Sequence, residues 1–368
     1  MKALSSACAK GRRYTAGCCK LAVFFLFCLF VFCACPLNSS DSASRIFPFV
    51  KEGELCLFDA DSAGYKSCSF GNSYTQSAVA PSKKSGWTLA WNKAKGLLYH
   101  VDGAGKLKAK TSLSGAGAYV NKNYVLVQGS TFDQNKGFSF TLYSIKYTFG
   151  GKRIALKQLW KGSLDCFVSD SLFTEGGVCI AGGSRDNTKH NVFYITASGI
   201  HKCFTMAKNS DFLRLVSYGE NKLYAFLSQR EKSKKDAVLY SFSLDGQPEQ
   251  ALTINLEGDS ALPSDFDCFF GYGFAMSGVP EVSAVPEALE GAGGLILPAS
   301  MNGIINFICY DCSVGKIARI VPDAVGCVAY LGSSDAGALY VARDPLLDGS
   351  FYGIRLFDGR NSGAICTF

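Results

Sequence analysis

The chain has 368 residues, of which 48% are hydrophobic and only 18% charged, and this composition excludes a disordered chain of low hydrophobicity and high charge. Lys and Arg number 37 against 30 Asp and Glu, but five of the cations precede residue 35, leaving 32 against 30 and a net charge near +2. A nucleic-acid-binding domain would keep a strong positive excess, so we expect no nucleic acid partner.

The N-terminal residues have the layout of an export signal. Five cations and no acid precede residue 35, where the apolar run LAVFFLFCLFVFCAC at 21–35 ends. A basic segment followed by a short apolar segment is typical of a signal peptide. The run is also shorter than the roughly 20 residues that a helix needs to cross a bilayer.

The end of this run, VFCAC at 31–35, resembles the bacterial lipobox: two apolar residues, a tolerant position, a small residue and the cysteine that is lipidated. It departs from that pattern at Phe32, where Leu is usual, and at Pro36 directly after the cysteine. The resemblance implies a signal peptide over 1–34, acylation of Cys35 with palmitate among the acyl chains, and a tether over 35–45. The protein would then be attached through lipid to the cell membrane or outer membrane, on the periplasmic or surface side. An ordinary secretory signal and an uncleaved short anchor are the alternatives.

The body of the chain repeats a hairpin seven times. Each copy has an apolar strand centred on one position, a polar or glycine turn and a second strand, at 54–70, 96–113, 140–159, 191–207, 237–254, 304–321 and 350–368. The aligned positions are Cys56, Tyr99, Tyr143, Tyr194, Tyr240, Phe307 and Gly353, with steps of 43, 44, 51, 46, 67 and 46. A period near 45 is typical of propeller blades. The long step contains an insertion, SGVPEVSAVPEALEGAG at 277–293.

Two further strand-like runs precede most hairpins. They lie at 117–120 and 124–129, 165–168 and 177–183, 211–218 and 222–228, 267–276 and 294–300, and 326–332 and 337–342. Four strands per unit, repeated radially, predict an all-β fold: a single β-propeller over 46–368 with about seven blades of four antiparallel strands. The first copy has room for only one earlier strand, at 46–51, so that blade is expected to be incomplete. An all-β sandwich or two stacked domains are the alternatives.

The loops between second and third strands concentrate the charge of the body. They lie at 130–137, 184–191, 228–237 and 343–350, and a propeller places such loops on one face. The candidate partner face comprises Lys136, Arg185, Lys189, Arg230, Lys232, Lys234, Lys235 and Arg343. The insertion at 277–293 joins a first strand to a second and is expected on the opposite face.

No motif of the body indicates a metal, a cofactor or a catalytic group. Cys309 and Cys312 have CxxC spacing, but they end a strand, where residues three apart point to opposite faces. Glycine clusters and Asp-Gly pairs are typical of turns. The three histidines have no partner at metal-ligand spacing. The ten cysteines after Cys35 permit disulfides in an exported chain but do not determine them.

The predicted function is protein binding by a lipid-anchored envelope scaffold, with another envelope protein as partner. In outline the chain resembles the propeller lipoproteins of outer-membrane protein assembly, an architectural likeness only. A surface adhesin and a propeller enzyme acting on a small or glycan substrate in the central channel are the alternatives. For the enzyme, the candidate carboxylates at the starts of innermost strands are Asp165, Asp211, Asp265 and Asp267, although a turn preference explains their recurrence.

Overall fold

The computed structural model describes residues 45–207, 213–218, 222–231, 234–244, 248–255, 274–276, 294–301, 304–322, 326–334, 337–343, 352–358 and 362–367. The signal-peptide, lipobox and tether predictions for residues 1–44 therefore lie outside the described residues, as does the insertion at 277–293. Across the described ranges, no helix is both long and apolar enough to cross a membrane.

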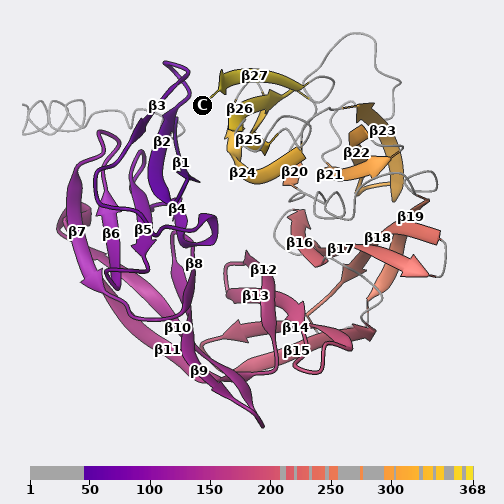
Figure 1. The fold of residues 1–368 in the computed structure, drawn as a ribbon, viewed down its shortest axis with the longest axis horizontal. Coiled ribbons are helices and arrows are strands. Elements are labelled where there is room, and N and C mark those ends of the chain that lie inside the picture. Colours follow the sequence, from indigo (N-terminus) through magenta and orange to yellow (C-terminus); the bar gives the residue numbers. More distant parts are fainter. Residues whose placement is uncertain are drawn as a thin grey trace, which may run out of the picture. The chain divides into compact units, whose positions relative to one another are not determined.

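The body is a seven-bladed β-propeller, as predicted. Its strands form one three-stranded sheet and six four-stranded sheets, and within each sheet neighbouring strands are antiparallel and consecutive in sequence. In Figure 1 the sheets form a ring, with one strand of each sheet nearest the centre. Only two short 3-10 turns, η1 (Gln76–Ala78) and η2 (Phe149–Gly151), interrupt the strands of the described residues.

The first four blades lie in residues 45–207, which are described without a gap. Blade 1 contains β1 (Ile46–Lys51), β2 (Glu54–Asp59) and β3 (Gly64–Ser67), and blade 2 contains β4 (Val79–Pro81), β5 (Thr88–Asn92), β6 (Leu97–Val101) and β7 (Leu107–Ser112). Blade 3 contains β8 (Gly117–Val120), β9 (Tyr124–Asp133), β10 (Gly137–Thr148) and β11 (Arg153–Leu164). Blade 4 contains β12 (Phe167–Phe173), β13 (Gly177–Gly183), β14 (Lys189–Thr196) and β15 (Ile200–Ala207).

The last three blades repeat the same order. Blade 5 contains β16 (Leu213–Tyr218), β17 (Lys222–Glu231), β18 (Lys234–Phe242) and β19 (Glu249–Asn255). Blade 6 contains β20 (Phe274–Met276), β21 (Gly294–Met301), β22 (Ile304–Asp311) and β23 (Lys316–Pro322). Blade 7 contains β24 (Gly326–Ser334), β25 (Gly337–Arg343), β26 (Tyr352–Phe357) and β27 (Ser362–Thr367). Each predicted first and second strand thus has a counterpart, and the starts agree within two residues except for the predicted strand at 267–276, of which only Phe274–Met276 lies within the described residues.

The hydrophobic core is divided among the blade interfaces. The described residues contain seven clusters of buried apolar side chains, and each cluster joins two neighbouring blades. The ring is closed by the cluster in which Phe49 and Phe58 of blade 1 pack with Leu339 and Ile354 of blade 7. A sheet that is apolar on both faces needs a neighbour on each side, so closure buries the faces that an open row of blades would expose to water.

The five aligned aromatics all lie on third strands, as the repeat predicts. Tyr99 lies on β6, Tyr143 on β10, Tyr194 on β14, Tyr240 on β18 and Phe307 on β22. Phe307 and Tyr99 are buried, at 0% and 5% exposure, whereas the other three are half-buried. The pairing of third with fourth strand also contains a register shift within three residues of the aligned position in each four-stranded blade. Such bulges increase the local twist of a strand pair.

The first blade is incomplete, but its alignment with the other copies was wrong by one strand. β1 contacts β4 and β24, which are innermost strands of the neighbouring blades. The pairing of β2 with β3 also lacks the register shift that marks third and fourth strands. Cys56 on β2 therefore lies on a second strand, and the described part of blade 1 lacks the outermost strand.

Candidate functional site

The turns between second and third strands in blades 3 and 4 are shaped by their own aspartates. Asp133 accepts hydrogen bonds on Oδ1 from the backbone N–H groups of Asn135 (2.7 Å) and Lys136 (3.1 Å). Asp186 accepts one from Ser184 Oγ (2.5 Å) and one from Thr188 N (3.0 Å). The Ser184 hydroxyl, followed by the Thr188 N–H, lowers the pKa of Asp186 to about 2. Short aspartate-to-backbone bonds of this kind are an ordinary means of fixing a turn.

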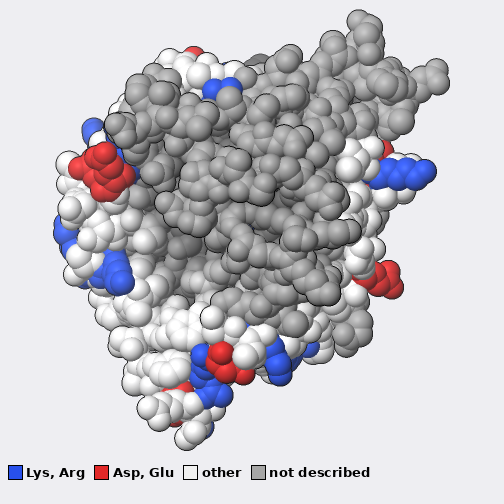
Figure 2. All heavy atoms as spheres, turned by 45° about the vertical axis from the view of Figure 1, so that its right-hand side comes forward, with Lys and Arg blue, Asp and Glu red and all other residues white. Residues whose placement is uncertain are grey.

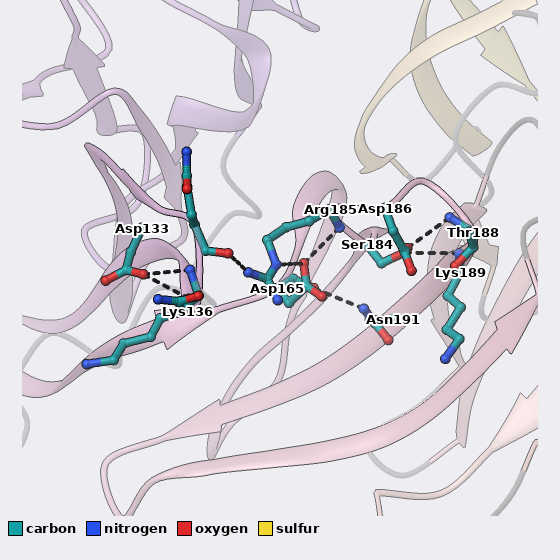
Figure 3. A network of polar contacts seen from close by, with 11 residues as sticks. Asp133, Lys136, Asp165, Ser184, Arg185, Asp186, Thr188, Lys189 and Asn191 are labelled. Atoms are coloured by element: carbon teal, nitrogen blue, oxygen red, sulfur yellow. Dashed lines mark hydrogen bonds and ion pairs between the residues drawn. The ribbon is translucent and has the colours of Figure 1, made fainter.

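Arg185 connects these two turns across the blade boundary. Its backbone N–H donates to Asp165 Oδ1 (2.8 Å), and its Nε lies 3.1 Å from the same oxygen. Its Nη1 donates to the carbonyl oxygen of Gln134 in the turn of blade 3. Asn191 donates to the Asp165 carbonyl oxygen (2.9 Å), as Figure 3 shows. Arg185 is thereby held in one position between the blades.

An open hollow lies beside this arginine. It measures about 440 Å³ and is lined by Phe132, Gln134, Asp165, Arg185 and Asp186. We call it the loop hollow. Asp165, one of the candidate carboxylates predicted at the start of an innermost strand, lines this hollow and pairs with Arg185. The other three candidates, Asp211, Asp265 and Asp267, lie outside the described residues.

Three phenylalanines form a cluster beside the loop hollow, of which Phe132 and Phe167 are exposed and Phe138 is half-buried. Phe132 is the second-last residue of β9, Phe138 is the second residue of β10 and Phe167 begins β12. Phe138 lies 4.9 Å from Phe132 and 5.0 Å from Phe167 between ring centroids, and the other pair is 6.1 Å apart. Phe132 and Phe167 are 41% and 47% exposed. This cluster was not predicted from the sequence, because its members come from two blades.

The predicted cations lie at different places along these loops. Lys136 and Lys189 are exposed, and their side chains extend away from the hydrogen-bonded network in Figure 3. Arg230 on β17 is in register with Lys235 on β18. Lys234 begins β18, Arg343 ends β25, and Lys232 lies outside the described residues. The structure thus brings together Lys136, Arg185 and Lys189 around two adjacent turns.

The charges of the visible surface are mixed. In the view of Figure 2, the described surface carries small groups of Lys and Arg beside Asp and Glu, without one sign dominating. This distribution on the described, visible surface agrees with the net charge near +2 after residue 34.

A second hollow, the axial cavity, lies between the innermost strands. It measures about 430 Å³, and its lining includes Gln76, Tyr119, Ser169, Asp170, Ser171 and Tyr330. These residues come from blades 2, 3, 4 and 7, and Leu215 of blade 5 adds to the wall. The cavity therefore exists only when the ring is assembled.

Asp170 supplies the carboxyl group in the described lining of the axial cavity, and backbone N–H groups of the protein already bond to both of its oxygens. Its Oδ2 accepts a hydrogen bond from Leu215 N of blade 5 (2.7 Å), and its Oδ1 accepts one from Ser171 N (2.8 Å). Arg214 Nη1 returns a bond to the Ser169 carbonyl oxygen (3.0 Å). Burial raises the pKa of Asp170 to about 6, against the opposing effects of the two N–H donors and the Arg214 charge. The residue joins blade 4 to blade 5.

The CxxC cysteines and His100 are buried inside the protein. Cys309 and Cys312 belong to different interface clusters, so the two thiols lie on opposite faces of blade 6, as predicted. Buried His100 contacts Ser82 Oγ through Nε2 (2.7 Å) and the Gly151 carbonyl oxygen through Nδ1 (2.8 Å), under the ring of Trp87. Within the described ranges, no three His, Cys, Asp or Glu side chains lie close enough together to hold a metal ion.

No protein-family model matches the chain, and the comparison with curated proteins also finds no match. Among solved structures, hydrazine synthase of Kuenenia stuttgartiensis is similar at 11% identity and a TM-score of 0.52, covering 89% of this chain and 93% of that one. A candidate 6-phosphogluconolactonase from Bacteroides fragilis is similar at 10% identity and a TM-score of 0.52, covering 90% and 95%. Likeness at such low identity supports the propeller fold alone.

Proposed function

We propose that this protein is an exported, lipid-anchored binding scaffold whose partner surface is the loop hollow of blades 3 and 4. The observation that carries the proposal is the cluster of exposed Phe132 and Phe167 with half-buried Phe138, in which Phe132 lines the loop hollow together with Arg185. Binding energy at protein interfaces is concentrated in aromatic and arginine side chains near the centre of the contact. A cluster of this composition on a rigid ring supports a protein partner.

The position of Arg185 supports the same interpretation. Asp165 and Gln134 already hold its guanidinium group and backbone. A side chain fixed before binding loses little conformational entropy when a partner arrives. Its contacts within the protein also position the two turns that carry the hollow, so Arg185 organises the surface as well as contributing to it.

Cations and carboxylates are equal in number around the hollow, and we propose that its exposed lysines meet carboxylates of the partner segment. Asp133 and Asp186 are engaged by backbone and hydroxyl donors of their own turns. The exposed ammonium groups of Lys136 and Lys189, by contrast, extend away from the network. A segment with an apolar anchor for the phenylalanines and carboxylates for the lysines matches this surface.

The lipid anchor rests on the sequence at Cys35. We expect a Cys35→Ser variant to lose incorporation of radiolabelled palmitate and to accumulate as precursor. Labelling that persists in this variant would contradict lipidation at Cys35. An adhesin would use the same surface from the outer side of the envelope, and protease accessibility on intact cells distinguishes the two locations.

Site-specific photocrosslinking tests the partner surface in cells. A photoreactive phenylalanine analogue placed at Phe132 or Phe167 should give a discrete crosslinked protein. The matched control is Phe149, which is 70% exposed and has the Arg153 guanidinium 4.8 Å from its ring. Phe149 follows the far end of the 12-residue β10, roughly 35–40 Å from Phe138 at about 3.3 Å per residue. Equal crosslinking from position 149, or none from 132 and 167, would refute the proposed surface.

A further inference from the structure

We propose that the axial cavity is a binding site for a neutral, hydroxyl-rich ligand, such as an uncharged mono- or disaccharide. The cavity of about 430 Å³ falls in the range of small-molecule sites, which are roughly 300–1,000 Å³. This site is separate from the loop hollow, and the two have no lining residue in common.

The charges of the lining favour a ligand without net charge. Asp170 is the ionisable carboxyl of the described lining, and each of its oxygens already accepts a backbone N–H. The described lining contains no Lys, Arg or His. An anionic ligand would therefore enter without a counter-charge, which is costly, and a cation would meet only Asp170, whose two oxygens already accept N–H groups.

The lining nevertheless offers hydrogen bonds. Gln76 Oε1 accepts Val50 N (3.0 Å), which fixes the side chain and leaves its amide N–H groups as donors. Ser77 donates its hydroxyl hydrogen to the Ala118 carbonyl oxygen and Ser169 donates its own to that of Ala181 (both 3.2 Å), so both hydroxyl groups are held in place in the wall. Ser171, half-buried in the wall, adds a third hydroxyl. Mixed fixed donors and acceptors suit a ligand that has many hydroxyl groups.

Aromatic rings supply the remaining wall. Tyr119, Phe173 and Tyr330 border the cavity from blades 3, 4 and 7. The face of an aromatic ring carries partial negative charge and attracts the weakly positive C–H groups of an apolar surface. A sugar presents C–H groups on its ring faces and hydroxyl groups around its edge, which matches rings and polar side chains arranged around one space.

Calorimetric titration of the purified full-length protein with single sugars tests the site. The probes are maltose, cellobiose and N,N'-diacetylchitobiose, compared with the anionic digalacturonate and the cationic chitobiose. We expect one of the neutral sugars to bind at one site and the charged sugars to bind at least tenfold more weakly.

Two substitutions locate the binding. Gln76→Glu keeps the acceptor for Val50 N but removes the amide donors and adds a charge, and Ser171→Val removes a hydroxyl. Each should weaken binding of the neutral sugar at least tenfold, whereas Gln158→Glu, at an exposed position of β11, should leave the affinity unchanged. Unchanged melting temperatures show that the variants are folded.

Three results would overturn the inference. They are no binding of any neutral sugar at about 10 mM, where a site with a Kd of about 1 mM would be nearly saturated, preference for a charged sugar, or binding unaffected by both substitutions. Crosslinking from Phe132 is a separate measurement, so loss of the partner surface and loss of the sugar site are distinguishable.

Discussion

The loop hollow and the axial cavity each depend on an aspartate at the beginning of blade 4, but the two aspartates have different surroundings. Asp165 holds Arg185 at the surface, where 37% of its side chain is exposed. Asp170, five residues later, is 8% exposed and accepts an N–H from the next blade. Water has better access to the first site than to the second. The same residue type therefore orders a surface loop at the rim and joins two blades inside the ring.

Substitution in the hydrophobic core between two blades should lower the free energy of unfolding more than substitution at either aspartate. Phe307→Ala removes a fully buried ring at the interface of blades 6 and 7 and should cost about 3–5 kcal/mol in the free energy of unfolding. Ile317→Ala in the same blade, at 36% exposure, is the control and should cost far less. Urea unfolding followed by circular dichroism measures both. A small effect at Phe307 would show that the interface clusters do not carry the stability.

The two aspartates should differ clearly on replacement. Asp170→Ala leaves the N–H groups of Leu215 and Ser171 without their acceptor and should cost about 2–4 kcal/mol at pH 5, given roughly 1–3 kcal/mol for an orphaned buried donor. Asp165→Ala removes an exposed ion pair and should cost below about 1 kcal/mol. Equal losses of unfolding free energy for the two variants, measured by urea unfolding, would show that the two aspartates do not differ in their contribution to stability.

Asp170 should also make stability depend on pH. Its pKa is about 6 in the folded protein and 3.8 ordinarily, so the folded state binds the proton more tightly than the unfolded state. Its stabilising contribution is complete below about pH 4 and is lost as the pH rises through 6, by up to about 3 kcal/mol.

Asp170→Asn should remove this pH-dependent fall. The difference in unfolding free energy between wild type and Asp170→Asn, measured from pH 4 to 7.5, isolates the effect. Buried His100, whose pKa is lowered by burial, acts in the opposite direction and cancels in this difference. A difference that is constant with pH would show that Asp170 has an ordinary pKa.

The smallest effect on stability is expected at the lysines of the loop hollow. The double variant Lys136→Glu and Lys189→Glu should change the unfolding free energy by less than about 1 kcal/mol for each residue, because both are exposed. Association with the crosslinked partner should slow markedly at low salt and less at high salt. Lys152→Glu, at the far end of β10, is the matched control. Equal binding by all variants would exclude the lysines from the partner surface.

Local patterns in the sequence determine much of this protein. Aromatic-centred strands, Asp-Gly turns and a period near 45 predicted the seven blades and the position of every described third strand except that of blade 1. The turns at Asp133 and Asp186 are likewise determined by nearby residues, because their hydrogen bonds join positions at most three apart in the sequence. Hydrogen bonds and side-chain alternation within one hairpin are readable because the interacting residues are close in sequence.

Only the tertiary structure decided the rest. Blade 1 could not be aligned correctly from its sequence, because the position of β1 depends on its contacts with β24 and β4. The phenylalanine cluster joins residues 132 and 167, and Asp170 meets Leu215 across 45 positions. Their proximity follows from ring closure, in which each blade buries its faces against two neighbours. Sequence periodicity predicts the blades, but the surfaces and cavities between blades arise only when the faces pack together.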